Sequence, residues 1–217
     1  MAEIYPSIIS ANLADLKEEL KRLDPYVQGY HIDIMDGNFV PNLTWGPAMT
    51  NAIATMSSRT HNWAHLMVTT PQIYIKPLLL APGSVLTFHF ESACDVNDMI
   101  KLILEKNWKP SIAIKPKTDA EKVFPFLNKV HQVVVMSVEP GFSGQDFLPE
   151  SIKKVELLAA YRSTSKLNFR IGIDGGINNE NIALLAEKGA DDFAVASAIF
   201  ANKRPIEALK ELQEKIA

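Results

Sequence analysis

The feature that most constrains the fold is a regular alternation of short β-branched runs with longer segments of helical period. The runs predict strands at residues 4–9, 30–35, 63–68, 85–90, 111–114, 133–138, 169–173 and 193–196. The segments between them predict helices at residues 13–23, 93–106, 149–161, 179–188 and 205–216. Because a helical crossover returns the chain in the same direction, this alternation predicts parallel strands.

Eight strand–helix units with short connections fit a (β/α)8 barrel, a fold of about 200 to 400 residues. The chain has 217 residues, at the small end of that range. An open doubly wound sheet is the alternative, but eight similar units without a long insertion favour closure. No linker divides the chain, and the Ser/Thr cluster at residues 162–166 is expected to be a loop. We therefore predict one α/β barrel domain over residues 1–217.

Composition excludes several classes of protein. Lys and Arg total 22 against 25 for Asp and Glu, a net charge of −3, so no global field would draw nucleic acid, although a local pocket could bind a small anion. The single Cys94 cannot form an internal disulfide, which suits a reducing compartment. Residues 1–10 lack the pattern of a signal peptide, and no apolar run is long enough to span a bilayer. We expect a cytoplasmic protein with neither nucleic-acid nor membrane partners.

Two predicted strands carry polar side chains toward the barrel interior. Alternation places His31, Asp33 and Met35 on one face of the second strand, and His65 and Met67 on one face of the third. Burying an unpaired carboxylate costs several kcal/mol, so an inward carboxylate needs a metal, a cation or a raised pKa. The structural alternative is a hydrogen-bonded polar pair at the strand end, with a core histidine beside it.

The last three strands end in segments that suit an anion. Asp174 is followed by Gly175 and Gly176, which predict either a tight turn or backbone N–H groups exposed to a phosphate. The loop at residues 139–145 is small enough to approach an anion, and the eighth strand runs into residues 196–200. Because barrel phosphates are commonly held after strands seven and eight, we predict one anion site here.

Side chains from strands two, three and seven should meet at the barrel mouth. His31, Asp33, His65 and Asp174 offer imidazole and carboxylate ligands, which suit Zn, Fe(II), Mn or Co. A metal would also neutralise both buried carboxylates. His61, four residues before His65, would lie a layer lower and is predicted to be structural.

Six stretches of the chain, in order and spacing, resemble the ribulose-phosphate 3-epimerase family. They are residues 6–10, 31–42, 65–68, 136–142, 174–176 and 197–200. The twelve residues at 31–42, HIDIMDGNFVPN, are highly specific by themselves. The resemblance covers nearly the whole chain and implies a ribulose-phosphate-binding barrel.

The resemblance implies a reaction and a metal. It implies that His31, Asp33, His65 and Asp174 bind one divalent ion per chain (Zn, Fe(II), Mn or Co), and that Asp33 and Asp174 are the catalytic acid/base pair. The implied activity is epimerisation at C3 of D-ribulose 5-phosphate to D-xylulose 5-phosphate, in the pentose phosphate pathway, through a cis-enediolate. The resemblance also implies a homo-oligomer.

The resemblance further implies substrate contacts. Those around the reacting carbon are Ser7, His65, Met35, Met67 and Met136. Those around the phosphate are Gly141, Phe142, Ser143, Gly144, Gly175, Gly176, Ala196 and Ser197. Ser143 and Ala196 stand where the family usually has Gly, and Gly172 stands where Glu is common. Ser143 and Ala196 are expected to affect substrate affinity, and Gly172 is expected to remove a side chain that would support Asp174. None of the three is expected to change the type of reaction.

Three alternatives remain open. A 3-epimerase of another ketose phosphate, such as allulose 6-phosphate, would use the same metal and carboxylates. A phosphate-binding barrel of the indole or thiamin pathway would share the last two loops without the set of two His and two Asp. A catalytically inactive scaffold is opposed by retention of all four predicted ligands.

Overall fold

The structure is a computed structural model that describes residues 2–59 and 61–217. One sheet contains the strands β1 (Glu3–Pro6), β2 (His31–Met35), β3 (Trp63–Met67), β4 (Val85–His89), β5 (Lys109–Ile114), β6 (Gln132–Met136), β7 (Arg170–Asp174) and β8 (Asp192–Val195). Their order is β1-β8-β7-β6-β5-β4-β3-β2, and every paired neighbour is parallel. A parallel bridge between Ser7 and His31 brings β1 to β2. The predicted parallel barrel is confirmed, and the open sheet is wrong.

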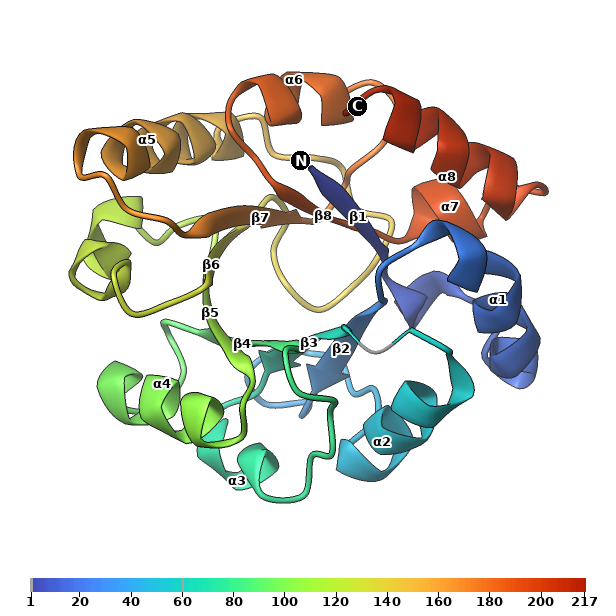
Figure 1. Ribbon diagram of the computed structural model, residues 1–217, viewed down its shortest axis with the longest axis horizontal. Helices are drawn as coiled ribbons and strands as arrows, with labels where there is room; N and C mark the ends of the chain where they lie inside the picture. Colours follow the sequence, from blue (N-terminus) through green and yellow to red (C-terminus); the bar gives the residue numbers. More distant parts are fainter. Residues whose placement is uncertain (1, 60) are drawn as a thin grey trace.

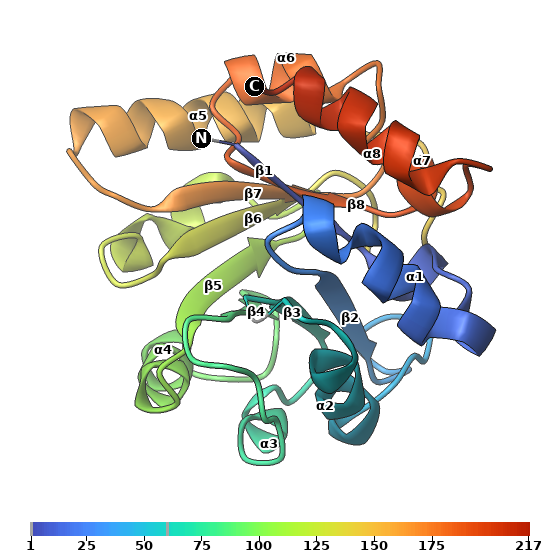
Figure 2. The same ribbon diagram turned by 45° about the vertical axis from the view of Figure 1, so that its right-hand side comes forward.

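Helices surround the strands as an outer ring (Figures 1 and 2). They are α1 (Leu16–Leu23), α2 (Pro47–Met56), α3 (Gln72–Ile75), α4 (Val96–Glu105), α5 (Ser151–Thr164), α6 (Ile182–Glu187), α7 (Ser197–Phe200) and α8 (Pro205–Glu214). Short 3₁₀ helices lie at η1 (Ile8–Ser10), η2 (Leu13–Asp15), η3 (Asp24–Tyr26) and η4 (Ala120–Phe126). Within the part of the chain that the structure describes, no helix has the length and apolar character needed to cross a membrane.

Several predicted boundaries are wrong, for local reasons. The first strand ends at Pro6, because the chain turns into η1, so the expected strand over residues 4–9 is too long. The expected helix over residues 13–23 begins as η2, and Leu13 is exposed while Leu16, Leu20 and Leu23 are buried. The expected loop at 162–166 is partly helical, because α5 continues to Thr164.

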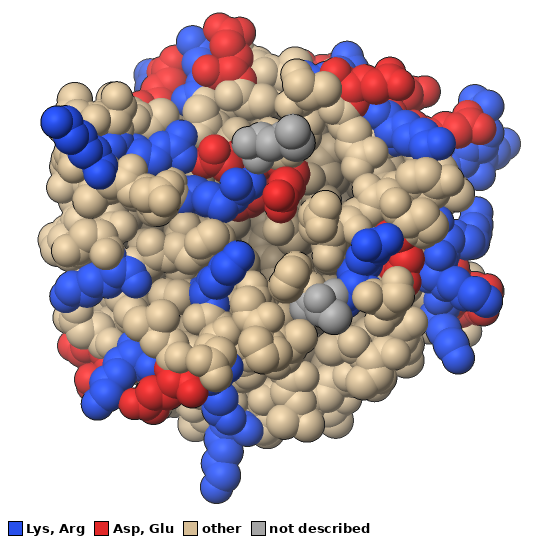
Figure 3. Space-filling view, in the orientation of Figure 1, with Lys and Arg blue, Asp and Glu red and all other residues tan. Residues whose placement is uncertain are grey.

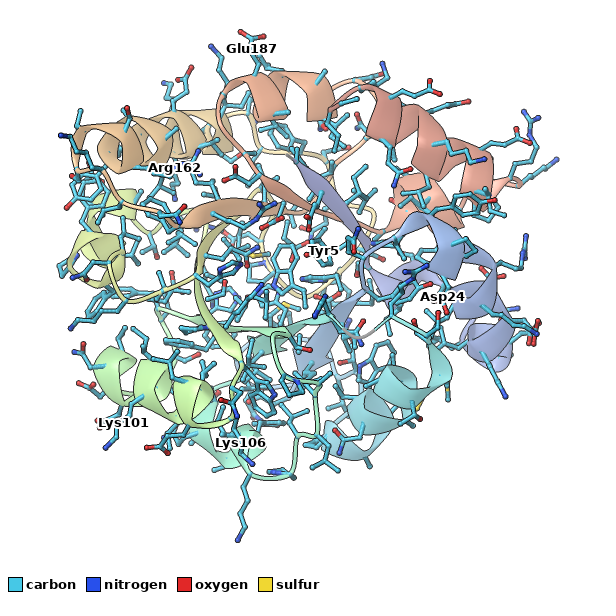
Figure 4. The ribbon with its side chains drawn as sticks, in the orientation of Figure 1. Tyr5, Asp24, Lys101, Lys106, Arg162 and Glu187 are labelled. Carbon is cyan, nitrogen blue, oxygen red and sulfur yellow. The ribbon has the colours of Figure 1, made fainter. Side chains whose placement is uncertain are left out.

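The interior of the barrel has its own apolar layer. Alternation along the strands turns seven side chains inward: Tyr5, Trp63, Val85, Ala113, Val134, Met136 and Ala194. Figure 4 shows Tyr5 in the middle of the ring of strands. A larger core of Ile, Leu, Val and Phe side chains fills the space between strands and helices.

Buried polar groups complete the interior. The Trp63 ring donates to the Thr87 hydroxyl (2.7 Å), the Ser111 hydroxyl to Gln132 (2.8 Å), and the Gln132 amide to Asp192 (2.8 Å). These buried groups satisfy one another's hydrogen-bonding capacity, as buried polar groups in folded proteins generally do. On the face that Figure 3 shows, acidic and basic side chains are intermixed.

Candidate metal centre and active site

A pocket opens at the carboxyl ends of the strands. Its side-chain walls come from six strands or strand ends, and they include Ser7, Asp33, Met35, Met67, Met136, Asp174 and Ala194. The loops after β6, β7 and β8 complete it with Gly141, Phe142, Ser143, Gly144, Gly175, Gly176, Ala196 and Ser197. The pocket therefore brings together the residues predicted for the phosphate and those predicted for the reacting carbon except His65, which is fully buried and is not among the lining residues.

Strand register decides which of these side chains are neighbours. Asp33 on β2 is opposite His65 on β3, and Met35 is opposite Met67. Met136 on β6 is opposite Asp174 on β7. Asp33 and His65 therefore share one inward layer, and Met35 and Met67 form the next layer toward the carboxyl ends. His31, two residues before Asp33, lies in the layer below, opposite Trp63.

His31, Asp33, His65 and Asp174 form a tight cluster. One ligand atom from each lies within 4.8 Å of the others. Nδ1 of His65 lies 3.1 Å from Oδ2 of Asp174 and 3.7 Å from Oδ1 of Asp33. Nε2 of His31 lies 3.8 Å from the same Asp174 oxygen. Both imidazoles are fully buried, and the Asp33 and Asp174 side chains are 6% and 15% exposed.

The two oxygens of Asp33 have different surroundings. Oδ2 accepts a hydrogen bond from the Ser7 hydroxyl (2.6 Å) and lies 3.1 Å from Nδ1 of His31. Burial alone would raise the pKa of Asp33, but His31, His65 and the Ser7 hydroxyl lower it to about 2. Oδ1 is the oxygen that faces His65. Oδ2 is thus held by Ser7 and His31, while Oδ1 faces His65.

The donor set fits a divalent cation. Nε2 of His31 is buried and has no hydrogen-bond partner among the described residues. Burial alone would lower the pKa of His31, but Asp33 and Asp174 raise it, so the cluster favours positive charge. A buried nitrogen without a partner beside two nearly buried carboxylates is poorly solvated unless a cation supplies the missing interaction. Imidazole and carboxylate ligands together suit a transition metal.

Sequence reasoning missed His89 and Glu91, which lie behind the cluster. Nε2 of His89 is 3.0 Å from Nε2 of His65, and Nδ1 of His89 is 3.3 Å from Oε2 of Glu91. Burial lowers the pKa of His89 to about 4. Burial alone would raise the pKa of Glu91, but hydrogen bonds from His89, Thr118 and the Lys115 backbone lower it to about 2.

The loops beyond the cluster are closely packed against one another. Gly176 has φ +65°, and a Cβ built there would lie 2.8 Å from the Phe147 backbone, so a larger residue does not fit. The Asn42 amide donates to the Gly141 carbonyl (2.6 Å), which ties the loop after β2 to the loop after β6. Among the described residues, no Lys or Arg side chain lines the pocket. An anion there would meet backbone N–H groups and hydroxyls.

The residues that depart from the family pattern are also placed. Ser143 and Ala196 line the pocket. Gly172 lies below it, against Trp63 and Gln132. His61 lies beside Gly83 and away from the cluster, in a separate depression at the amino ends of the strands.

Comparison with known proteins agrees with the geometry. A sequence model described as the ribulose-phosphate 3 epimerase family matches residues 3–200. A rice protein named ribulose-phosphate 3-epimerase, cytoplasmic isoform, is 39% identical, with 99% of this chain and 94% of the relative covered. The Escherichia coli protein named ribulose-phosphate 3-epimerase is 32% identical, covering 99% and 96%.

Solved structures show the same fold at low sequence identity. KGPDC from Streptococcus mutans matches with a TM-score of 0.71 and 13% identity, covering 100% of this chain and 97% of that one. A 3-hexulose-6-phosphate synthase matches with a TM-score of 0.67 and 16% identity, covering 100% of both chains. At these identities, the matches show that the architecture is shared and nothing more.

Proposed function

This chain belongs to the ribulose-phosphate 3-epimerase family, and on that premise we propose that it inverts C3 of D-ribulose 5-phosphate to give D-xylulose 5-phosphate. It is an enzyme of the carbohydrate epimerase class. The observation that carries the proposal is that Asp33 and Asp174 belong to one tight cluster, in a pocket whose other wall is built from the loops after β6, β7 and β8.

The four clustered residues would hold one divalent ion, Zn, Fe(II), Mn or Co. His31 would contribute Nε2, which has no hydrogen-bond partner among the described residues and lies 3.8 Å from Asp174. His65 would contribute Nδ1, which lies 3.1 Å from Asp174. When bound, such an ion acts as a Lewis acid that stabilises negative charge developing on the substrate oxygens, a contribution of several kcal/mol.

Inversion needs one group that removes the C3 proton and another that returns a proton from the opposite side. We assign removal to Asp33, because Ser7 and His31 stabilise its carboxylate form. Asp174, from the other side of the barrel, delivers a proton to the planar enediolate, and the roles exchange in the reverse direction. Two carboxylates that share a site favour one proton between them, which is the state this exchange requires.

Three methionines limit water around the reacting carbon. Met35, Met67 and Met136 are buried to 96% or more and line the pocket. Their polarisable sulfurs give a largely dry wall beside the carboxylates. Exclusion of water strengthens the interactions between the carboxylates and the substrate and keeps the proton exchange between defined groups.

The loops after β6, β7 and β8 would hold the substrate phosphate. Gly141, Ser143, Gly144, Gly175, Gly176 and Ser197 offer backbone N–H groups or hydroxyls at the pocket wall, and Phe142 and Ala196 flank them. Binding at this end fixes the distance from the phosphate to C3, so binding energy is converted into orientation.

Substrate choice is the direct test of this function. Ribulose 5-phosphate and allulose 6-phosphate should be assayed side by side with metal-loaded protein, with chelator-treated protein and after the metal is restored. We expect a higher kcat/KM for ribulose 5-phosphate, loss of activity with chelator and recovery with a divalent ion. A higher kcat/KM for allulose 6-phosphate would identify the alternative epimerase, and full activity without metal would refute the assigned centre.

We also propose that residues 1–217 act as one domain, that the enzyme is a homo-oligomer and that it works in the cytoplasm. The family resemblance supports the oligomer. The name of the rice relative and the free Cys94 support the location.

A further inference from the structure

A second line of buried groups extends from the cluster to the loop after β5. Nε2 of His65 meets Nε2 of His89 at 3.0 Å, and Nδ1 of His89 meets Oε2 of Glu91 at 3.3 Å. The two imidazole rings stack with centroids 5.0 Å apart and planes 18° apart. Both rings are fully buried, so water does not compete for these nitrogens.

The Glu91 end of this line is held as an acceptor. Oε1 of Glu91 accepts from the Lys115 backbone N–H (2.8 Å) and from the Thr118 hydroxyl. The Lys154 ammonium donates to three carbonyls of that loop, those of Lys115, Pro116 and Thr118. With Oε1 occupied by two donors, Oε2 is the oxygen that faces His89, and it requires a donor there.

The proton positions then follow one after another. Two imidazole nitrogens 3.0 Å apart share one proton, and an imidazole that donates from Nδ1 to a carboxylate can accept at Nε2, so Nε2 of His89 is the acceptor of this pair. Nε2 of His65 must therefore carry a proton and donate to His89. This leaves Nδ1 of His65, the nitrogen 3.1 Å from Asp174, as the one that can present a lone pair.

We propose that Glu91 and His89 are positioning residues that set the tautomer of His65, so that its Nδ1 faces the cluster as a metal ligand. The inference rests on the proposed metal site, and it assigns a task to two residues outside the four ligands. Partners behind a ligating histidine typically change metal affinity by roughly 10- to 100-fold when they are altered.

The substitution Glu91→Gln tests the direction of these hydrogen bonds. Because Oε1 must still accept from Lys115 and Thr118, the amide nitrogen of the new side chain takes the place of Oε2 and donates to His89. The proton order then reverses, and His65 becomes protonated at Nδ1. Competition of Co²⁺ against a chromophoric chelator should show metal affinity lower by about tenfold or more, with an altered Co²⁺ absorption spectrum.

Two matched variants distinguish an effect of hydrogen-bond direction on metal affinity from an effect of altered side-chain packing. His89→Gln keeps an acceptor toward His65 and a donor toward Glu91, so Co²⁺ affinity should stay within about threefold of the parent. Thr118→Val removes a hydrogen bond to Oε1 of Glu91, the oxygen that faces away from His89, so Co²⁺ affinity should again stay within about threefold of the parent. A loss of affinity that is equal in all three variants would mean a packing role and would overturn the proposal.

The proton position on His65 can also be measured in the parent protein, so this test does not depend on whether a variant folds. Long-range ¹H–¹⁵N NMR of metal-free protein should find a proton on Nε2 of His65, and a bare Nε2 would overturn the proposal. This readout is independent of the proposed function. If the protein bound no divalent ion, the metal centre would fail, while the NMR spectrum would still decide the tautomer.

Discussion

Gly172 and Trp63 occupy one space inside the barrel: a Cβ built on Gly172 would lie 3.1 Å from Cη2 of the Trp63 ring and 3.1 Å from Nε2 of Gln132. The Trp63 ring is fully buried and meets His31 edge-on, with ring centroids 4.6 Å apart. The volume that a glutamate side chain would need at position 172 is therefore filled by the indole. The departure from the family pattern at this position is accompanied by a bulky neighbour that packs beneath the cluster.

Gly172→Glu should destabilise this protein by about 3 kcal/mol or more, because the new side chain overpacks the interior and buries a charge. The penalty should be smaller in a Trp63→Leu background, where the space is open. Urea unfolding of both single variants and the double variant measures the coupling. Equal penalties in the two backgrounds would show that the two positions do not share this space.

The fold class was predictable from sequence because the strands are long enough for their alternation to show and because the helices between them carry apolar stripes. The short helices α3 (Gln72–Ile75) and α7 (Ser197–Phe200) span about one turn each, so they leave no periodic signal. The segment η4 contains Pro125, which is incompatible with a regular helix interior, and no helix was predicted there.

The cluster of His31, Asp33, His65 and Asp174 was predictable because alternation alone turns these side chains inward near strand ends. The partnership of His89 with Glu91 was not recognised, although they continue the inward pattern of Val85 and Thr87. Their role depends on contacts between strands and on which oxygen of Glu91 the next loop occupies. Spacing along one strand carries neither piece of information.

Ser7→Ala should lower kcat/KM by roughly tenfold or more, because a hydrogen bond to a buried charged group contributes about 1.5–3 kcal/mol. The Ser7 hydroxyl lies 2.6 Å from Oδ2 of Asp33 and stabilises its carboxylate form. Steady-state kinetics checks this, with Ser10→Ala in the same segment as the control. An unchanged kcat/KM in Ser7→Ala would remove the hydroxyl from the account.

Ala196→Gly should lower the KM for the sugar phosphate or leave it unchanged, because the methyl group lies at the wall of the phosphate end of the pocket. The reaction itself should be unaffected, so kcat should stay within about twofold (less than 0.5 kcal/mol). A KM several-fold higher than that of the parent would show that Ala196 does not crowd the phosphate.

Asp24→Asn should lower the free energy of unfolding by about 2 kcal/mol at pH 7. The Asp24 carboxylate, beside α1 in Figure 4, accepts from the hydroxyls of Tyr30 (2.8 Å), Ser57 (2.6 Å) and Ser58 (2.8 Å) and from the Ser58 N–H (2.7 Å). Burial alone would raise the pKa of Asp24, but bonds from Ser57, Ser58 and Tyr30 lower it.

The difference in the free energy of unfolding between the parent and Asp24→Asn should shrink as the pH falls. Because the folded pKa of Asp24 lies below the unfolded value of about 3.9, its contribution is fully present above that value. It is lost as the pH falls through the folded pKa, so the parent and Asp24→Asn should converge in stability below about pH 4. Denaturant titrations at pH 7 and pH 3 check this, and a difference that widens in acid would contradict it.

The central claim is that Asp33 and Asp174 carry protons to and from C3 on opposite sides of the substrate. Incubation of ribulose 5-phosphate in D₂O with metal-saturated enzyme measures this directly, by the deuterium that appears at C3. The account predicts that the parent incorporates deuterium as it epimerises. It also predicts that Asp33→Asn and Asp174→Asn, folded by circular dichroism, lose both epimerisation and incorporation. Retention of full epimerase activity in either variant would contradict the account.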